Sequence, residues 1–560
     1  RDQKGIANPL ASANLAKNQS RNFDLGTNLA LEYDLLGIDN NKTRLTYRGS
    51  VNINSSSSYS NDDRPRELMM SNGDFLNAHS SSASSSKSLS FSTRHNLNFV
   101  PVFKNRDHYA TMQASFQLSR STNSSQNTSG KRLPEGITDP SAGGLIGGMG
   151  SSWGEGKSMA YYYTTHYSYK GRYVLGGTLR MDGTTRLGPN KRWFFVPAIS
   201  SRWNIGDEKW WNPVKKAIKM SEFGVSLNFG IQGNQPSGEY MYLNKYTTGD
   251  TYLGTTSMVS SSLKMSNFNA ERVYQTDMRF NLGFLDQKLT IGLDLYNRQT
   301  IGMLTTGFIS SATGWENIPY KNEGNMRNRG WELSANANNI IKVGKFGVDL
   351  YLNFANNENL ITKMDELTLE NRNKDDEIEY MTNGKTLQRV QVNNPFGAIY
   401  GFRCKGTYQY KYSTAEKIAR DDRKNGTTKL QDMIDQGYTI PIALAAATDE
   451  HPYGKVVYNE KSEPIQMMYY YKQKDASYIS KFDGGDAMYE DTNNDGQIDN
   501  LDLVYLGSSL PKLNGGFGFT FRYGHWRLST QFNYRVDIDV FNQARMNMEN
   551  MNGTTNQSQA

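Results

Sequence analysis

The sequence predicts an all-β fold, a transmembrane antiparallel β-barrel with long extracellular loops. The first observation is alternation: between Gly330 and Asn356, apolar and polar residues take turns on both sides of a short turn at 342–345. Side chains of a strand point to opposite faces with a period of two, so each run has one apolar and one polar face. The second observation is that short and long connections alternate along the chain, as in outer-membrane barrels. A sheet in hydrocarbon has to close on itself, because lipid cannot satisfy its backbone groups.

The composition agrees with this class. Of 560 residues, 37% are hydrophobic and 12% aromatic. A barrel needs an apolar residue only at every second strand position, so its composition stays polar. The longest apolar stretch, near residues 440–447, is far shorter than the ~20 residues of a membrane helix. The net charge of +7 is scattered, which argues against a nucleic-acid partner. The single cysteine, Cys404, excludes a disulfide framework and is expected to be a small packed residue.

We expect about fourteen strands, separated by turn and loop signals. In chain order they cover residues 23–33, 45–53, 89–99, 110–118, 161–169, 173–180, 193–205, 221–231, 278–284, 289–296, 331–338, 346–354, 515–523 and 526–536. The Ser-rich stretches 55–87 and 119–157 are expected to be long polar loops, as are 233–270 and 300–329. Four tryptophans near strand ends predict an interfacial aromatic belt, with ligand stacking as the alternative. These are Trp193, Trp203, Trp210 and Trp211.

The order of the turns predicts the domain organisation. Residues 1–355 form barrel strands with extracellular loops, and residues 514–560 form a barrel hairpin and the start of the next outer loop. Both 342–345 and 524–525 are short turns, so the segment 356–513 between them begins and ends outside the membrane. We therefore expect 356–513 to be a large extracellular region, in which 398–408 is not a wall strand. Within it, a capping box at 413–416 predicts a short helix to about Arg423, and 363–381 is expected to be helical or coiled.

The sharpest local motif is a twelve-residue loop from Asp491 to Asp502. Oxygen-bearing side chains stand at positions 1, 3, 5, 9 and 12 of this loop, and Gly496 stands at position 6, the spacing that wraps oxygens around one Ca²⁺ ion. The predicted ligands are Asp491, Asn493, Asp495, Gln497 through its backbone carbonyl, Asp499 and Asp502. The departure is Asp502, where Glu is usual and reaches further. The prediction is a structural calcium ion that pins a surface loop; the alternative is an Asx-rich turn that binds nothing.

One long loop carries candidate substrate contacts. Tyr240, Tyr242, Tyr246 and Tyr252 follow one another between two predicted strands. Aromatic rings with a polar tip bind sugars and peptides, so these residues are predicted to line a substrate site, while packing of the loop on itself is the alternative. The six histidines are dispersed, with no His-x-x-x-His pair. We predict no catalytic residues and no enzyme; Asp294, Arg298, Asp349, Arg527 and Arg535 are expected to line a hydrated lumen or contact a plug.

Several longer stretches match the pattern of one transporter family. They are 180–188 (Arg-Met-Asp-Gly-Thr-Thr-Arg-Leu-Gly) followed by 195–198, 230–235 (Gly-Ile-Gln-Gly-Asn-Gln), 322–333, 394–402, 405–409, the Asp491 loop and 511–516. Together they cover most of the chain, and jointly they are specific. The chain resembles the SusC/RagA-type TonB-dependent transporters of the Bacteroidetes outer membrane. One departure is Asn269-Ala270-Glu271-Arg272, where the family often has a Trp-Glu pair.

This resemblance implies a barrel of about 22 strands, an N-terminal plug, a motif that couples to the TonB complex, and a SusD-like lipoprotein lid. Its implied function is TonB-dependent import of a large nutrient, an oligosaccharide or peptide, across the outer membrane. The chain starts at Arg1 without a signal-peptide core, and we expect it to be the barrel portion of a longer protein. Two other functions stay open: a passive outer-membrane pore, and a β-rich surface adhesin or interaction protein.

Overall fold

The computed structural model describes most of the chain. The described residues are 9–39, 41–69, 79–309, 312, 317–373, 387–465, 481–494, 496, 498, 500–540, 542 and 544–545. They divide into two compact units: Arg1–Asn353 with Phe517–Phe532, and Phe354–Gly516 with Asn533–Ala560. Each unit is described by itself.

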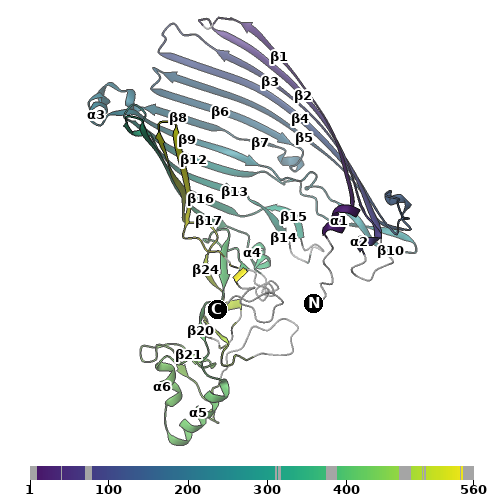
Figure 1. Cartoon of the computed structure of the whole chain (residues 1–560), viewed down its shortest axis with the longest axis vertical. Helices are drawn as coiled ribbons and strands as arrows, with labels where there is room; N and C mark the ends of the chain where they lie inside the picture. Colours follow the sequence, from purple (N-terminus) through teal and green to yellow (C-terminus); the bar gives the residue numbers. More distant parts are fainter. Residues whose placement is uncertain are drawn as a thin grey trace. The chain divides into compact units, whose positions relative to one another are not determined.

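One antiparallel sheet of 15 strands dominates the molecule (Figure 1). The strands of the sheet lie in the order in which they occur in the chain, apart from a small β7 that pairs with β6, and further elements are inserted after β9, β13 and β17. The strands are β1 (Lys17–Leu36), β2 (Arg44–Arg64), β3 (Ser80–Val100), β4 (His108–Lys131), β5 (Leu145–Tyr169), β6 (Tyr173–Thr184), β7 (Trp193–Phe195), β8 (Ala198–Asn204), β9 (Met220–Asn234), β12 (Glu271–Phe284), β13 (Leu289–Ile301), β16 (Asn325–Val343), β17 (Phe346–Lys363), β25 (Leu513–Tyr523) and β26 (Trp526–Val536). The predicted all-β meander is confirmed.

The register shows why these residues form a membrane wall. Phe280, Leu293 and Leu333 pair across β12, β13 and β16, and so lie side by side on one face. One residue further along, Asp294 pairs with Glu332 on the opposite face. Because the side-chain period is two, the register places the apolar residues of the middle of these strands on one side and Arg279, Asp294 and Glu332 on the other. This is the pattern of a barrel wall between lipid and a hydrated interior.

Four strands are longer than the sequence predicts. The stretches 55–87 and 119–157 are mostly strand: β2 continues to Arg64, β3 starts at Ser80, and β5 alone has 25 residues. A membrane crossing needs only about 9–11 strand residues. Beyond the hydrocarbon both faces of a strand can contact water, so serine can stand at every position and the apolar–polar alternation is lost. Serine hydroxyls of neighbouring strands form hydrogen bonds, as between Ser58 Oγ and Ser86 Oγ at 2.6 Å. Polar composition alone therefore misled the loop prediction.

Most connections follow the predicted alternation of short and long; the exception is 205–219 between β8 and β9, where a short turn is expected and a longer segment with helical turns is found. The β16–β17 turn places Gly344 at φ +58°, and the β12–β13 turn holds three residues, Leu285 to Gln287, at positive φ. The expected single strand 193–205 is divided into β7 and β8. Pro197 stands at the break, where a residue without an N–H cannot continue the ladder.

The long connections carry the smaller elements. Five small sheets pair β10 (Tyr246–Tyr252) with β11 (Thr255–Ser260), β14 (Leu304–Phe308) with β15 (Asn317–Asn322), β18 (Leu387–Gln388) with β19 (Ala398–Gly401) and β24 (Val504–Ser508), β20 (Cys404–Thr407) with β23 (Ala487–Tyr489), and β21 (Leu444–Ala445) with β22 (Lys455–Val456). The stretch 398–408 thus lies outside the wall, as the order of turns requires.

Helices are short. They are α1 (Pro9–Leu15), α2 (Arg66–Met69), α3 (Asn212–Ala217), α4 (Glu366–Arg372), α5 (Tyr412–Asn425) and α6 (Lys429–Asp435), with 3-10 turns η3 (Pro140–Ala142), η4 (Pro189–Lys191), η5 (Ile205–Asp207), η6 (Lys209–Trp211) and η9 (Asn500–Asp502). Within the described residues, no helix has the length and apolarity that a membrane span needs.

The second unit contains a helical module, which we define as residues 412–465. Its core packs α5 and α6 against the segment that follows them, and the core residues are Ala415, Ala419, Leu430, Ile434, Ile440, Ile442 and Val456. The apolar stretch at 440–447 thus supplies part of the buried core of this module. The predicted short helix is present as α5, but it begins at Tyr412 after Lys411 with no side-chain cap, so the expected capping box is wrong. The prediction for Cys404, on β20 before the module, is also wrong, because this residue is exposed.

Candidate functional site

The polar face of the wall carries a network of opposite charges on β12, β13 and β16. Arg279 forms an ion pair with Asp294, which stands opposite Glu332. Four residues further along β13, the Arg298 guanidinium lies 5.0 Å from the centre of the Tyr296 ring. These side chains border a depression of about 170 Å³. Acidic and basic side chains thus stand next to one another on this polar surface.

A second ion pair joins β17 to β25. Asp349 pairs with Arg522, and its Oδ1 accepts a hydrogen bond from the Asn339 backbone N–H at 2.8 Å. Of the residues expected to line the lumen, Asp294 and Asp349 therefore lie in ion pairs between neighbouring strands, and Arg298 contacts Tyr296 of its own strand. The wall's polar face is built of charges that neutralise one another.

Aromatic residues gather near both ends of β6. At one end Trp203 pairs with Tyr173, and the two rings stack at 6.3 Å. Trp210 and Trp211 continue this cluster, with ring centres 5.5 Å apart. At the other end Trp193 pairs with Gly183 and stacks on Tyr161 at 6.2 Å. Two clusters, one toward each end of the strand, match the spacing of aromatic girdles at two membrane interfaces.

A buried acid that sequence reasoning missed anchors the first cluster. Glu208 is 6% exposed and accepts hydrogen bonds from Arg172 Nη1 at 3.0 Å and from Tyr173 Oη at 2.6 Å. Trp203 Nε1 donates a third bond at 3.3 Å. A buried carboxylate needs such partners. The sequence signal for this site is an acid that stands next to two tryptophans in Gly-Asp-Glu-Lys-Trp-Trp (206–211).

The four candidate tyrosines do not form one site. Tyr242 is 5% exposed, packs with Phe194 and Phe268, and accepts a bond from Arg192 Nη2 at 3.2 Å. Tyr240 accepts a bond from the Glu155 backbone N–H, also at 3.2 Å. The remaining two, Tyr246 and Tyr252, lie exposed on β10. The loop uses half of its tyrosines for its own packing and presents the other half to solvent.

The predicted calcium loop is described in part. Asp495, Gln497 and Asp499 lie outside the described residues. Asp491 Oδ2 accepts a bond from the Gly496 backbone N–H at 2.8 Å, which bends the loop back on its first residue. The side chain of Asp502 is fully buried, and its Oδ1 accepts bonds from Thr492 N at 2.7 Å and Thr492 Oγ1 at 3.0 Å. The first and last candidate ligands thus both turn toward the loop.

Charged groups stand immediately before this loop. The Glu490 carboxylate pairs with Lys405 Nζ at 2.9 Å and Arg403 Nη1 at 2.7 Å. The hydrogen bond from Lys405, followed by the charges of both bases, holds the pKa of Glu490 below its ordinary value despite partial desolvation. Ile498, within the loop, is buried with Tyr408, Ala443 and Phe482. The loop is therefore fastened to the body of its unit.

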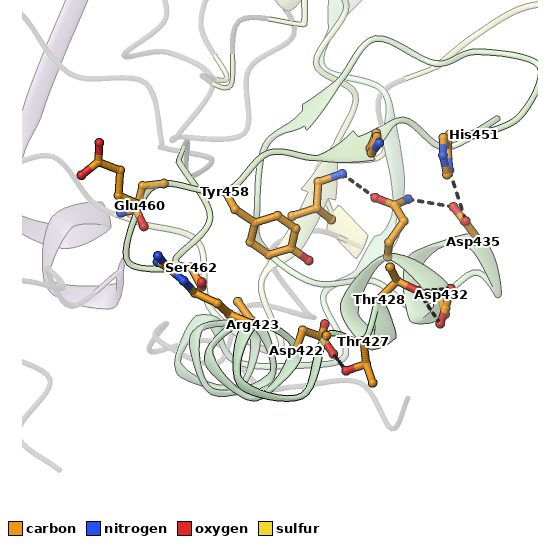
Figure 2. Close-up of a pocket in the computed structure, with 16 residues that line it drawn as sticks. Asp422, Arg423, Thr427, Thr428, Asp432, Asp435, His451, Tyr458, Glu460 and Ser462 are labelled. Atoms are coloured by element: carbon orange, nitrogen blue, oxygen red, sulfur yellow. Dashed lines mark hydrogen bonds and ion pairs between the residues drawn. The ribbon is translucent and has the colours of Figure 1, made fainter.

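The helical module contains a cavity of about 590 Å³ that is lined by both polar and apolar residues (Figure 2). Figure 2 shows Tyr458 between two groups of polar side chains. On one side lie Arg423, Glu460 and Ser462; on the other lie Asp432, Asp435 and His451. Sequence reasoning missed this cavity, because its walls come from segments up to 43 residues apart that share no motif.

One pattern typical of serine hydrolases does occur, Gly-x-Ser-x-Gly from Gly150 to Gly154. It needs a sharp strand-to-helix turn that lifts the serine out of the sheet. Here the five residues lie in the middle of β5, paired with β4 from Asn127 to Asn123. The pattern is a stretch of ordinary strand.

A family model described as TonB dependent receptor-like, beta-barrel matches residues 2–445. The TonB-dependent receptor P39 of Formosa agariphila is 26% identical over 381 residues, which is 68% of this chain and 33% of the relative. The TonB-dependent receptor SusC of Bacteroides thetaiotaomicron is 28% identical over 48% of this chain and 27% of its own length. This chain thus spans about a third or less of these relatives.

Solved structures agree on the fold. The RagAB peptide transporter superposes with a TM-score of 0.69 at 15% identity, covering 97% of this chain and 51% of that chain. Receptors of this kind are outer-membrane β-barrels that act as transporters or receptors, not as enzymes. The match over most of the chain, together with a wall of alternating strands, shows that this chain belongs to the TonB-dependent receptor-like β-barrel family.

Proposed function

We propose that the protein containing this chain imports a large nutrient, an oligosaccharide or a peptide, across the outer membrane by TonB-dependent energy coupling. The observation that carries the proposal is the family match over residues 2–445 on a wall whose inner face is polar and charge-balanced. A hydrated wall without a strong net field lets a large polar solute pass without trapping it. The force that opens the path would come from the TonB complex acting on a plug.

We also propose a SusD-like surface lipoprotein as the partner that covers the outer loops. The support is relationship to SusC and a fold shared with the RagAB transporter. The partner would hold the nutrient over the loops until the plug moves.

Uptake by cells tests both proposals. The complete gene is deleted in its own host, and growth is followed on defined oligosaccharides and on defined peptides as sole nutrient. We expect growth to fail on one nutrient class, and to fail equally when TonB is removed. Affinity purification of the tagged protein should recover a lipoprotein. Normal growth on every large nutrient would contradict the import proposal.

The two other functions are separable from import. A passive pore predicts large constitutive conductance in single-channel recordings of the complete protein, whereas a plugged transporter stays closed. A surface adhesin predicts extraction without detergent. A membrane barrel needs detergent and resists unfolding in cold SDS.

For the loop 491–502 we propose a structural Ca²⁺ ion, held by Asp491, Asn493, Asp495, the carbonyl of Gln497, Asp499 and Asp502. The support is the ligand spacing and the bend that brings Asp491 to Gly496. The buried Asp502 already binds Thr492, so it would contribute its second oxygen. Such an ion would fix the loop by neutralising its carboxylates.

Calcium titration of the complete protein tests this. The wild type should unfold at a higher temperature in calcium than in chelator, with about 2.7 kcal/mol of added stability at a Ca²⁺ concentration 100 times Kd. Asp491→Asn should weaken Kd about tenfold or more, while Asp449→Asn, in an exposed turn of the same unit, should not change it. If Asp491→Asn and Asp449→Asn had the same Kd for Ca²⁺, the loop would be an Asx-rich turn that binds no metal.

A further inference from the structure

The cavity of the helical module is lined by residues of the module itself and by none of the loop 491–502. It is built by α5, α6, β22 and the turn after β22, all within residues 419–462. Its volume of about 590 Å³ falls in the range of pockets that hold small organic ligands. Its polar side chains fall into two groups, those that form hydrogen bonds within the module and those that do not.

Three of the polar side chains are used by the fold. Asp422 is buried and accepts bonds from Thr427 Oγ1 at 2.5 Å, Lys429 N at 3.1 Å and Leu430 N at 2.9 Å, so it holds the start of α6. Asp435 accepts a bond from Gln431 Nε2 at 2.8 Å and faces His451 Nδ1 at 3.3 Å. Gln431 also accepts from Val456 N. These groups have little left to offer a ligand.

Five other groups around the cavity are uncommitted. Within the described part of the chain, no hydrogen bond or ion pair engages the side chains of Arg423, Lys455, Tyr458, Glu460 or Ser462. Ser462 is 6% exposed as a residue, and its side chain is part of the cavity lining. A hydroxyl at this position can exchange water for a hydrogen bond to a ligand.

The uncommitted charges cancel. Arg423 and Lys455 are positive, while Glu460 is negative and Asp432 accepts only from Thr428 Oγ1, at 3.2 and 3.3 Å. An anionic ligand would meet both acids, and a cationic ligand would meet both bases, so neither is favoured. Figure 2 shows Arg423 and Glu460 on the same side of Tyr458, so the charges are not separated into the two poles that a zwitterion needs.

A neutral ligand with many donors and acceptors fits this lining. The hydroxyls of a sugar ring donate to carboxylates and accept from guanidinium, ammonium and hydroxyl groups, and the apolar face of the ring covers an aromatic side chain. Tyr458 supplies a half-buried ring with its hydroxyl at the cavity. We propose that the helical module binds a neutral saccharide unit in this cavity, with Tyr458 as the stacking surface and Arg423, Glu460 and Ser462 as hydrogen-bond partners.

The proposal goes beyond import and does not rest on it, because binding to the module can be measured without transport. A failure of the growth test above would leave the binding test untouched, and the reverse also holds.

The test is calorimetric titration of the complete protein in detergent. The probes are neutral oligosaccharides (α-glucan, β-glucan, xylan and mannan hexamers), with trilysine, triglutamate and triglycine as cationic, anionic and zwitterionic competitors. We expect at least one oligosaccharide to bind and the three peptides not to displace it. Tyr458→Ala should weaken the binding by about tenfold or more. Tyr453→Ala removes a 58% exposed tyrosine of the same module outside the cavity, and should leave binding unchanged.

A second variant guards against a folding defect. Glu460 is exposed and makes no contact that the fold needs, so Glu460→Gln keeps the module intact while it removes the charge. It should lower saccharide affinity with no shift in the unfolding transition. Binding of a peptide in place of every oligosaccharide, no binding of any probe, or equal loss in the Tyr453 control would each overturn the proposal.

Discussion

The wall and the helical module stabilise themselves with the same residue types in opposite places. In the wall, Leu175 and Ile199 are 50% and 54% exposed, and their exposure is an asset because that face meets lipid. In the module, Leu430 is fully buried among Ala415, Ala419 and other core residues. Whether an apolar side chain is stable on the surface or only in the core therefore depends on whether that surface meets lipid or water. A substitution is therefore harmful or neutral according to the unit in which it is made.

The two regions also satisfy their backbones differently. The wall pairs each strand with its neighbours over long, regular ladders, such as the pairing of β12 with β13 from Arg272 to Phe284. The module's short helices expose unpaired N–H groups at their ends, and the Asp422 side chain accepts two of them. Stability in the wall is spread over many equal bonds, whereas in the module it is concentrated in a few side chains.

The largest expected effect is on the core of the module. Leu430→Ala removes a fully buried side chain, and we expect a loss of about 2–5 kcal/mol in the local unfolding free energy. Hydrogen exchange of the complete protein, read on peptides of residues 412–465, measures it. Val457→Ala, at a 42% exposed position of the same module, should change exchange little. If both variants exchanged alike, the module would lack a core of its own.

Next comes a charge on the lipid-facing side of the wall. Leu295 pairs with Met278 and Trp331 on that face. Leu295→Arg should cost about 2–4 kcal/mol near the middle of the membrane. Asn228 pairs with Asp277 on the polar face, so Asn228→Arg gains an acidic neighbour and should be tolerated. Urea unfolding in liposomes compares the two. A similar cost for both would contradict the assignment of faces.

A smaller effect is expected where one side chain holds a helix start. Asp422→Ala leaves the N–H groups of Lys429 and Leu430 without their acceptor and should cost about 1–3 kcal/mol. The matched control is Asp421→Ala, one residue earlier on the exposed side of α5. Proteolysis at the α5–α6 junction should accelerate in the first variant only. Unchanged proteolysis in Asp422→Ala would show that water replaces the carboxylate.

The smallest effect is a pH dependence confined to the module. Burial, and then the charges of Asp422 and Asp432, raise the pKa of Tyr458 from 10.0 to about 12. The folded state thus holds this proton more tightly than the unfolded state. The stability it contributes is complete below pH 10 and is lost as pH rises toward 12. Tyr458→Phe cannot ionise, so the wild type should lose stability relative to it above pH 10. Parallel curves would place Tyr458 in a solvated setting.

Much of the wall was predictable from sequence, for a physical reason. Alternation in 346–354 and the short turn at 342–345 are local, and a sheet in lipid has few ways to satisfy them. The order of short and long connections then placed 398–408 outside the wall. The prediction failed at 55–87 and 119–157, because serine-rich strands that are wet on both faces carry no period.

Sites were less predictable than strands. Tyr242 and Tyr246 stand in one loop with the same residue type, yet one is buried and the other exposed. Nothing in the adjacent sequence distinguishes them, since the burial of Tyr242 depends on Phe194 from β7 and on Phe268 from the far end of the loop. The exposure of Cys404 was misjudged for the same reason.

The sequence by itself determined that the chain is a β-barrel wall of an outer-membrane protein, because the two-residue period and the alternating turns are written in neighbouring residues. It also determined the spacing of the loop 491–502. Only the tertiary structure decided which charges of the wall pair, which tyrosines pack, and that Arg423, Tyr458, Glu460 and Ser462 border one cavity. The reason is that folding brings these groups together from segments tens of residues apart, and no local sequence pattern predicts such contacts.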